Sequence, residues 1–327
     1  MKTPRASIII PTHDRPDRLR RAIASAFAAS KDVEVIVVDD ASADETAQLC
    51  ASIAGIKYVR AERNQGVAGA RNLGLVASRG EFISFLDDDD LRLPNSLDDQ
   101  IEALSRSPAA MLCYAQAIPE DQTGKQGPPF PDACRQGDIF WDLLKGNFIP
   151  CGSVVFRRRC ISSAGLLDDS ISRIDDWDFW LRVTELFPVI GLKTPVLVWR
   201  APARNSRQGS SETVEVIELA IKHFRRNCRR MPRVARASRR QRQQSWRAFS
   251  MNLADHLAWE TFRSLCAADF SRAWVCARTL FKLHPGVLVH LTWRWTRAST
   301  IKTFIAGQHE PEGMKIRFKE IRSIPDT

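Results

Sequence analysis

The chain has 327 residues, 44% of them hydrophobic, which is enough for one large folded domain and an additional region. The best candidate for a membrane-spanning helix, 280–298, is interrupted by Lys282, His284 and Arg294, so composition argues against a membrane-spanning protein. The net charge of +10 belongs to one segment. Residues 222–247 hold eleven Lys and Arg and no acidic residue, whereas the rest of the chain has 37 basic and 38 acidic residues.

Two features of the sequence predict its compartment. Eight cysteines occur without a CxxC pair, and several lie in apolar surroundings, so we expect reduced thiols in a cytosolic protein. Residues 1–5 lead directly into a short apolar strand, so we expect no signal peptide.

The first 94 residues alternate between apolar strands and amphipathic helices. We expect strands at 7–10, 33–38, 56–59 and 82–86, and helices at 18–29, 45–53 and 67–78. Pro11 is expected to end the first strand, and Gly80 to end the third helix at its C-cap. The alternation predicts an α/β fold with a doubly wound, mostly parallel sheet flanked by helices.

The pattern loosens after residue 94 and then becomes helical. We expect helices at about 95–105 and 176–186, strands at 111–114, 154–156 and 196–199, and a Pro- and Gly-rich surface loop at 118–138. From about 212 onward we expect only helices, at 212–230, 240–268 and 270–283, with a break at Pro232. The chain therefore divides into a first region, 1–205, and an all-helical, basic C-terminal region, 206–327.

Polar residues follow three of the expected strands, at 11–15, at 39–42 and at Asp87 to Asp90. The carboxyl ends of parallel strands meet at one edge of a sheet, where open α/β folds bind ligands. Four successive carboxylates repel one another, and a shared Mg²⁺ or Mn²⁺, which prefers hard oxygen ligands, would stabilise them. The alternatives are a solvated acidic turn for this run and helix N-capping for the acids of 39–42.

Five segments occur in an order and spacing that are typical of a known family. They are 7–12 (SIIIPT), 37–42 (VVDDAS), 66–72 (GVAGARN), 85–90 (FLDDDD) and 175–182 (DDWDFWLR). Together they resemble the family 2 glycosyltransferases with the GT-A fold, over roughly residues 5–205. The resemblance implies a nucleotide-binding half at about 5–94 and an acceptor half at about 95–205. It implies nothing about 206–327.

For the donor, the resemblance implies a nucleotide-diphosphate sugar, with UDP favoured. Pro11, Thr12 and Asp40 would line the nucleobase pocket, where Asp40 would accept a hydrogen bond from a uracil-like ring N–H. Arg15 would belong to the same nucleotide-sugar site. Arg71 would approach the base or the diphosphate, because a guanidinium matches carbonyl and phosphate oxygens. Without the family context, Arg71 would be an exposed helix arginine.

The acidic run matches the DxD motif of the family. Asp87 and Asp88 are assigned to the nucleotide sugar, with Asp88 near the ribose, and Asp89 to direct ligation of Mn²⁺ or Mg²⁺. A run of four acids that includes Asp90 leaves this register ambiguous.

Family members often have Glu-Asp where this chain has Asp175 and Asp176. The resemblance implies that Asp176 is the catalytic base, which takes the proton of an acceptor hydroxyl and leads to inversion. The alternative is a helix N-cap at Asp176 and a first-turn acid at Asp178. The acceptor region is assigned to Gly152, Ser153, Asp175 and Trp177, with Trp177 as a candidate for stacking on a sugar.

These roles imply an inverting, metal-dependent glycosyltransferase that acts on a hydroxyl of a glycan or lipid-linked acceptor in cell-surface polysaccharide synthesis. A nucleotidyltransferase uses a similar sheet and similar acids, but it usually has a Gly-rich loop after the first strand, which 11–16 lacks. The third hypothesis is a non-catalytic adaptor that has a degenerate transferase fold and binds membrane or nucleic acid.

The basic segment 222–247 is a candidate surface for a polyanion. Nucleic acid is the weaker candidate, because Phe224 and Trp246 are the only aromatic residues there and no RNA-binding motif is present. Anionic lipid headgroups fit better, and a solvated basic helix is the alternative. Interfacial anchors would come from Trp259, Phe262, Trp274, Phe281, Trp293 and Trp295. We therefore expect a cytoplasmic protein that contacts the inner face of the cell membrane.

Overall fold

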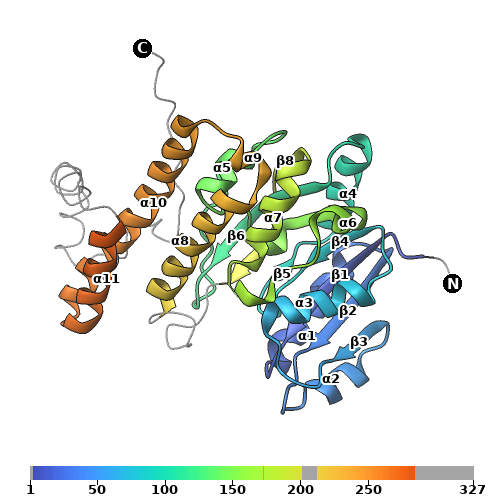
Figure 1. Ribbon diagram of the computed structural model, residues 1–327. Coiled ribbons are helices and arrows are strands. Elements are labelled where there is room, and N and C mark those ends of the chain that lie inside the picture. The colour runs from blue at the N-terminus through green and yellow to red at the C-terminus, as the bar shows by residue number, and fades with distance from the viewer. Residues whose placement is uncertain (1–2, 172, 201–211, 284–327) are drawn as a thin grey trace. The chain divides into compact units, whose positions relative to one another are not determined.

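The computed structural model describes residues 3–171, 173–200 and 212–283 (Figure 1). These residues form two compact units, one with 3–140 and 149–200, the other with 141–148 and 212–283. The second unit therefore includes 141–148, which the sequence-based division assigns to the first region.

An eight-stranded mixed sheet, in the order β3-β2-β1-β4-β7-β6-β8-β5, forms the centre of the first unit. Its strands are β1 (Ala6–Thr12), β2 (Val33–Asp39), β3 (Ile56–Arg60), β4 (Phe82–Phe85), β5 (Leu91–Arg92), β6 (Leu112–Glu120), β7 (Val154–Arg157) and β8 (Val189–Arg200). The strands β3, β2, β1 and β4 pair in parallel, as do β6 and β8. Strand β7 is antiparallel to β4 and β6, and β5 is antiparallel to β8. The predicted α/β fold with a mostly parallel sheet is confirmed.

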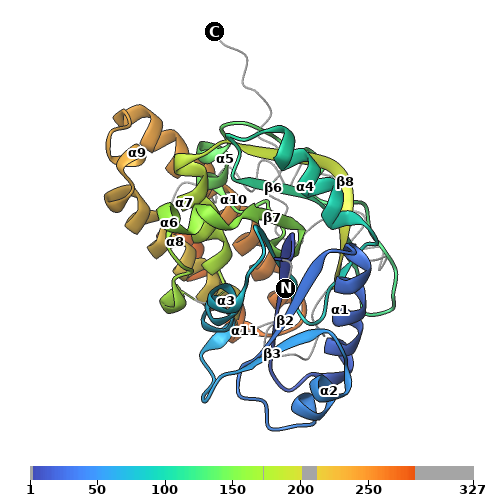
Figure 2. The same ribbon diagram turned by 90° about the vertical axis from the view of Figure 1, so that its right-hand side faces the viewer.

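Helices cover both faces of the parallel half of the sheet. The helices of this unit are α1 (Pro16–Ala29), α2 (Thr46–Ser52), α3 (Gly66–Ala77), α4 (Ser96–Arg106), α6 (Ile161–Ala164) and α7 (Asp175–Leu186). Ile8 shares a buried cluster with Leu19 of α1, whereas Ile9 lies against Gly74 of α3. Figure 2 shows α1 and α3 on opposite sides of these strands. This double coverage explains why the strands are apolar on both faces.

Two strands extend further than expected. Pro11 lies inside β1, opposite Val38, and does not end the strand. The pairing of β1 with β4 stops at Ile9, so Pro11 lies beyond the stretch that pairs on both sides, where its missing N–H costs least. Strand β6 continues to Glu120, so the first part of the expected surface loop at 118–138 is strand.

Gly80 does not end α3, because the C-cap of this helix is Ser78. A Cβ at Gly80 would lie 2.5 Å from the carbonyl carbon of Ala6 and 2.6 Å from the nitrogen of Ser7. The backbone of the α3–β4 connection therefore passes too close to β1 for any side chain. The glycine is required by close packing and not by the helix terminus.

The described part of the second unit is helical. It contains most of α5 (Phe140–Lys145), together with α8 (Glu212–Arg230), α9 (Pro232–Ala235), α10 (Arg239–Cys266) and α11 (Phe270–Leu283). Pro232 stands in the first turn of α9, which is the break that the sequence predicts. Helices α10 and α11 pack against each other. The expected helical C-terminal region is confirmed over 212–283, and no helix of the described ranges is long and apolar enough to cross a membrane.

The expected aromatic anchors of this unit divide into three groups. Trp259 is 7% exposed, so its assignment as an interfacial anchor is wrong, and Phe262, whose ring centroid lies 6.0 Å from that of Trp259, is half-buried. Trp274 and Phe281 are exposed. The two remaining tryptophans, Trp293 and Trp295, lie outside the described residues.

Candidate active site

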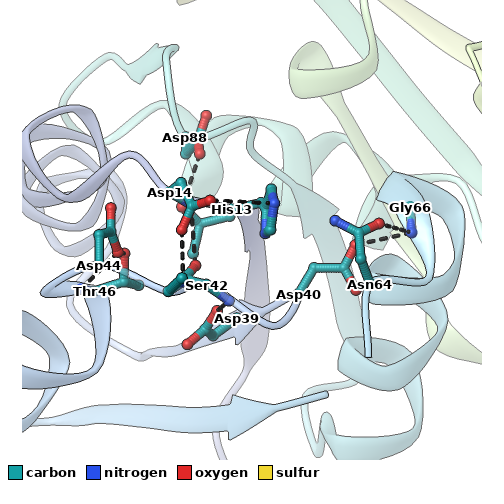
Figure 3. A network of polar contacts seen from close by, with 12 residues as sticks. His13, Asp14, Asp39, Asp40, Ser42, Asp44, Thr46, Asn64, Gly66 and Asp88 are labelled. Atoms are coloured by element: carbon teal, nitrogen blue, oxygen red, sulfur yellow. Dashed lines mark hydrogen bonds and ion pairs between the residues drawn. The ribbon is translucent and has the colours of Figure 1, made fainter. Parts of the chain in front are cut away.

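The ends of β1, β2 and β4 meet at one edge of the sheet. The backbone N–H of Asp40 donates to the carbonyl of Thr12 at 2.9 Å, which joins the ends of β2 and β1. The Thr12 hydroxyl donates to Asp88 Oδ2 at 2.8 Å, which joins β1 to the acidic turn after β4. Figure 3 shows Asp88 next to the polar network of these loops. The expected convergence of the strand ends is therefore present.

Asp39 closes the loop that follows β2. Its Oδ1 accepts the Ser42 N–H at 2.7 Å, and its Oδ2 accepts from the Tyr58 hydroxyl at 2.5 Å and from Arg60 Nη1 at 2.6 Å. Burial opposes ionisation of this carboxyl, but the hydrogen bonds from Ser42 and Tyr58 and the charge of Arg60 outweigh it and lower the pKa of Asp39. Asp39 is thus a structural carboxylate.

Asp40, the residue assigned to the nucleobase, holds the start of α3. Its Oδ1 accepts the Gln65 N–H and its Oδ2 accepts the Gly66 N–H, both at 2.8 Å, and Figure 3 shows Asp40 facing Gly66 and Asn64. The side chain is 4% exposed. The contacts of Asp40 are therefore those of the N-capping alternative. A nucleobase that bound to Asp40 would have to use a carboxylate that already accepts two backbone hydrogen bonds.

The carboxylates of the acidic run contact three arginine side chains and one backbone N–H. Asp87 Oδ1 accepts from Arg71 Nη2 at 2.7 Å, and Asp90 Oδ1 accepts the backbone N–H of Arg200 at 2.9 Å. Asp88 Oδ1 lies 3.2 Å from Arg15 Nη1, and Asp89 Oδ2 lies 3.6 Å from Arg15 Nη1 and 3.4 Å from Arg18 Nη1. Three arginines, from α1, α3 and the loop before α1, thus offset part of the charge of the run.

Burial and the neighbouring negative charges change the pKa values of Asp88, Asp89 and Asp90 in the acidic run. Burial raises the pKa of Asp88 to about 6, against the opposing effects of Arg15 and Thr12. Burial and the neighbouring Asp87 raise the pKa of Asp89, and the same two causes raise that of Asp90 well above its usual range. A divalent cation would relieve this repulsion.

The donor set fits a hard cation completed by phosphates. The side chains of Asp87 and Asp89 are 38% and 19% exposed, whereas that of Asp88 is 6% exposed. Mg²⁺ is usually held by one or two carboxylates together with substrate phosphates. Within 3–171, 173–200 and 212–283 no group of three or more His, Cys, Asp or Glu is arranged to hold an ion by itself. Asp87 and Asp89 are the more exposed of these three carboxylates and are the candidates to hold such an ion.

Arg71 is a buried bridge and not an exposed helix arginine. Its side chain is 5% exposed, its Nη1 donates to Asp175 Oδ2 at 2.8 Å, and its Nη2 donates to Asp87. The guanidinium carbon lies 5.4 Å from the centroid of the Phe85 ring. Burial opposes this charge, but the surrounding acids raise the pKa of Arg71 further above its usual range. Arg71 therefore connects the acidic turn after β4 to the start of α7.

Helix α7 begins with the acids assigned to the acceptor side. Asp175 is 1% exposed and pairs with Arg71, so it is a structural partner of the bridge. Asp176 is half-buried, and its Oδ1 accepts the Trp177 N–H at 2.7 Å. Trp177 itself is 4% exposed, so its ring packs inside the protein and is not presented for stacking on a sugar.

The environment of Asp176 brings the pKa of its carboxyl close to neutral pH. Burial and the neighbouring Asp175 raise the pKa of Asp176 to about 7, against the opposing effect of Arg71. Asp87 adds to the rise, so the acids after β4 and those of α7 share one electrostatic field. A carboxyl with a pKa near the working pH is suited to general base catalysis.

The turn before β7 contributes Cys151 to this region. Ser153 is fully buried and donates through Oγ to the Pro150 carbonyl at 2.8 Å, and a Cβ on Gly152 would lie 2.9 Å from the Leu197 side chain. Both residues therefore have packing roles. Cys151 is half-buried. Burial raises the pKa of its thiol well above the usual range, and the thiol also interacts electrostatically with Arg71, Asp176, Asp87 and Asp175.

Comparisons with known proteins place this arrangement in a family. The family model described as glycosyl transferase family 2 matches residues 7–163, which contain the strand ends, Arg71, the acidic run and Cys151. An uncharacterized glycosyltransferase of Rickettsia typhi is 29% identical over 206 residues, which cover 57% of this chain and 61% of the relative. Residues 7–163 of the chain, just under half of its length, therefore match glycosyl transferase family 2.

Further relatives of this chain have more specific names. The succinoglycan biosynthesis protein ExoO of Rhizobium meliloti is 41% identical over 104 residues, covering 31% of this chain and 30% of the relative. The minor teichoic acid biosynthesis protein GgaA of Bacillus subtilis is 30% identical over 190 residues, covering 53% of this chain and 42% of the relative. The chain thus spans no more than about three fifths of the length of these relatives.

Solved structures support the GT-A fold of this chain. The crystal structure of S. aureus TarS 1–349 in complex with UDP has a TM-score of 0.53 and 16% sequence identity, and covers 93% of this chain and 92% of that one. The complex of the same protein with UDP-GlcNAc has a TM-score of 0.52, covering 82% and 89%. At this identity the likeness bears on the fold, and the expected GT-A type is confirmed.

The sequence-based predictions missed several residues of the candidate active site. Arg18 contacts Asp89, and its only signal is its position one helical turn after Arg15. The Arg200 N–H binds Asp90 through the backbone, for which no side-chain signal exists. Cys151 directly precedes Gly152 and Ser153, which are assigned to the acceptor region, but has no assigned role of its own. The remaining assigned residues of the donor side, Pro11 and Thr12, are buried at the end of β1.

Proposed function

We propose that this chain is an inverting, metal-dependent glycosyltransferase. It transfers a sugar from a nucleotide-diphosphate sugar, with UDP favoured, to a hydroxyl of a glycan or lipid-linked acceptor in cell-surface polysaccharide synthesis. The observation that carries the proposal is the Arg71 guanidinium, which binds Asp87 of the acidic run at 2.7 Å and Asp175, the neighbour of Asp176, at 2.8 Å. Burial and Asp175 also raise the pKa of Asp176 to about 7.

The donor assignment has support from the relatives. ExoO and GgaA are named for the biosynthesis of succinoglycan and of minor teichoic acid, and TarS was crystallised with UDP and with UDP-GlcNAc. We therefore favour a UDP-sugar for this chain. Thr12, Arg15 and Asp40 would bind the nucleoside part at the ends of β1 and β2, and Asp87 to Asp89 would face the ribose and diphosphate.

The chemical step follows from the position of Asp176. Its carboxylate takes the proton of the acceptor hydroxyl as the hydroxyl oxygen forms a bond to the anomeric carbon. The bond between that carbon and the phosphate oxygen of the donor breaks at the same time, and the nucleoside diphosphate leaves with the electron pair. A single displacement through an oxocarbenium-like transition state inverts the anomeric configuration.

Two other groups prepare this step. Arg71 positions Asp87 and Asp175 and limits the rise in the pKa of Asp176, so that the base is ionised in a useful fraction near pH 7. Asp87 and Asp89 are the carboxylates that would hold Mn²⁺ or Mg²⁺. When bound, the ion would supply charge stabilisation for the leaving diphosphate.

The test is a donor panel with the full chain. We would incubate the protein with Mn²⁺, an oligosaccharide acceptor and each of a panel of UDP-, GDP- and dTDP-sugars. The release of nucleoside diphosphate is then measured. Asp176→Asn should reduce turnover by a factor of about 10² to 10⁴. Asp169→Asn, an exposed acid of the preceding turn, is the matched control and should leave turnover unchanged.

Several outcomes would contradict the proposal. Full turnover in a folded Asp176→Asn variant would remove the assigned base. Release of pyrophosphate from a nucleoside triphosphate would support a nucleotidyltransferase. No calorimetric binding of any nucleotide with Mn²⁺ would support the adaptor reading.

A further inference from the structure

The outward face of α11 carries three exposed aromatic rings. Phe270 and Trp274 are each 69% exposed and Phe281 is 57% exposed. Their spacing of four and seven residues places them on one side of the helix. The buried residues of α11 lie on the other side, at Ala273, Cys276, Thr279, Leu280 and Leu283. The rings therefore lie mostly outside the packed interior of the helical pair.

The turn between α10 and α11 extends this apolar surface. Leu265, at the end of α10, is 50% exposed, and residues 266–269 are exposed as well. The single acid of the turn, Asp269, accepts the Arg272 N–H at 3.0 Å and so faces the positive end of the α11 dipole. Aromatic and aliphatic side chains thus gather at the tip of the helical hairpin.

The flank of the aromatic face is basic. Arg278 and Lys282 follow Trp274 by one and two helical turns, are exposed, and form no ion pair with any residue in the described ranges. Helix α11 has no acidic residue. In the same unit, the segment 222–247 holds eleven basic residues and no acid. Arg278 and Lys282 therefore give the outward face of α11 a charge that complements an anionic partner, and 222–247 adds positive charge elsewhere in the unit.

We propose that the outward face of α11 is a membrane-binding surface that inserts its rings between the headgroups of an anionic phospholipid bilayer. Helices with aromatic residues on one face and Lys or Arg beside them lie in the plane of the membrane interface. A self-complementary dimer through this face would bring Arg278 and Lys282 of two copies together without a compensating acid on α11. The bilayer is the occupant that satisfies both the rings and the cations.

This surface deepens the membrane contact suggested by 222–247, and it is independent of the sugar transfer. The rings of α11 would enter the interface, and the basic segment would add long-range attraction. Because the surface lies on a helix without any proposed catalytic residue, loss of vesicle binding should leave turnover with a soluble acceptor intact. Failure of this proposal and failure of the transferase proposal are therefore distinguishable.

The experiment is flotation of the full chain with vesicles. One set contains equal parts of phosphatidylglycerol and phosphatidylcholine, the other phosphatidylcholine alone. We expect binding to the anionic set, weakened by 1 M salt. The triple variant Phe270→Ser, Trp274→Ser, Phe281→Ser should bind at least about tenfold more weakly. The double variant Arg278→Gln, Lys282→Gln should lose about fivefold per charge.

Matched controls come from the first unit. Arg20→Gln with Arg21→Gln removes two exposed cations of α1, and Val76→Ser removes a 72% exposed apolar side chain of α3. Both should bind vesicles as the unaltered chain does. Absence of binding by the unaltered chain, or undiminished binding by the folded triple variant, would overturn the proposal. Self-association in light scattering that the triple variant abolishes, without vesicle binding, would assign the face to a second copy instead.

Discussion

Arg71 Nη1 donates to Asp175 Oδ2 at 2.8 Å, although 104 positions separate the two residues in the chain. The same guanidinium donates through Nη2 to Asp87 at 2.7 Å. One buried cation thereby ties the turn after β4, which we assign to the donor, to the first turn of α7, which carries the proposed base. The geometry of the proposed reaction depends on this link.

Arg71→Met should destabilise the fold. The change leaves the Asp175 carboxylate, which is 1% exposed, without its cation, and removing one partner of a buried pair costs about 3–5 kcal/mol. Urea denaturation at pH 7.5 measures the free energy of unfolding. Arg18→Gln, whose side chain is 48% exposed, is the control and should change it by less than about 0.5 kcal/mol. Equal stability of Arg71→Met and the unaltered chain would show that the bridge does not form.

The pH dependence of turnover should follow Asp176. This base must be ionised, so kcat/KM should rise with pH through about 7 and then level off. Asp175→Asn removes a negative charge that raises the pKa of Asp176, so the rising limb should move to lower pH. Profiles of nucleotide release from pH 5 to 9 measure the shift. A limb that moves to higher pH in Asp175→Asn would contradict this electrostatic account.

The sequence predicts the sheet well and the side-chain partners poorly. The apolar runs of β1, β2 and β4 and the acids after them are local patterns, so their convergence follows from the rules of parallel sheets. The contact of Arg71 with Asp175 has no local signal, because it arises when α3 and α7 meet. Asp40 shows the same limit. The sequence predicts an acid at the end of β2, but it does not predict the two hydrogen bonds that this acid accepts from Gln65 and Gly66.

Gly80→Ala should be strongly destabilising for a one-carbon change. The new Cβ would lie 2.5 Å from the carbonyl carbon of Ala6, and backbone atoms of a central strand yield little. We expect a loss of about 2–3 kcal/mol, the upper part of the range for overpacking. Gly127→Ala, where the nearest atom to a Cβ is 3.9 Å away, is the control in the same denaturation assay. If both variants unfold alike, the close approach at Gly80 is not a constraint.

Asp88→Asn should stabilise the protein, and the gain should grow with pH. Burial raises the pKa of Asp88 to about 6, against the opposing effects of Arg15 and Thr12, from an ordinary value of 3.8. The fold therefore favours the protonated carboxyl of Asp88. The contribution of Asp88 to the free energy of unfolding is fully present below about pH 3.8 and is lost as pH rises through 6. The difference of about two units corresponds to up to about 3 kcal/mol.

The neutral amide of Asn avoids this loss. The free energy of unfolding of Asp88→Asn should match that of the unaltered chain near pH 4 and exceed it by about 1–3 kcal/mol at pH 8, in buffer with EDTA. Asp169→Asn, an exposed acid, should show no such trend. If Asp88→Asn is instead less stable at pH 8, the ion pair with Arg15 outweighs burial, and the carboxylate is ionised in the fold before any cation arrives.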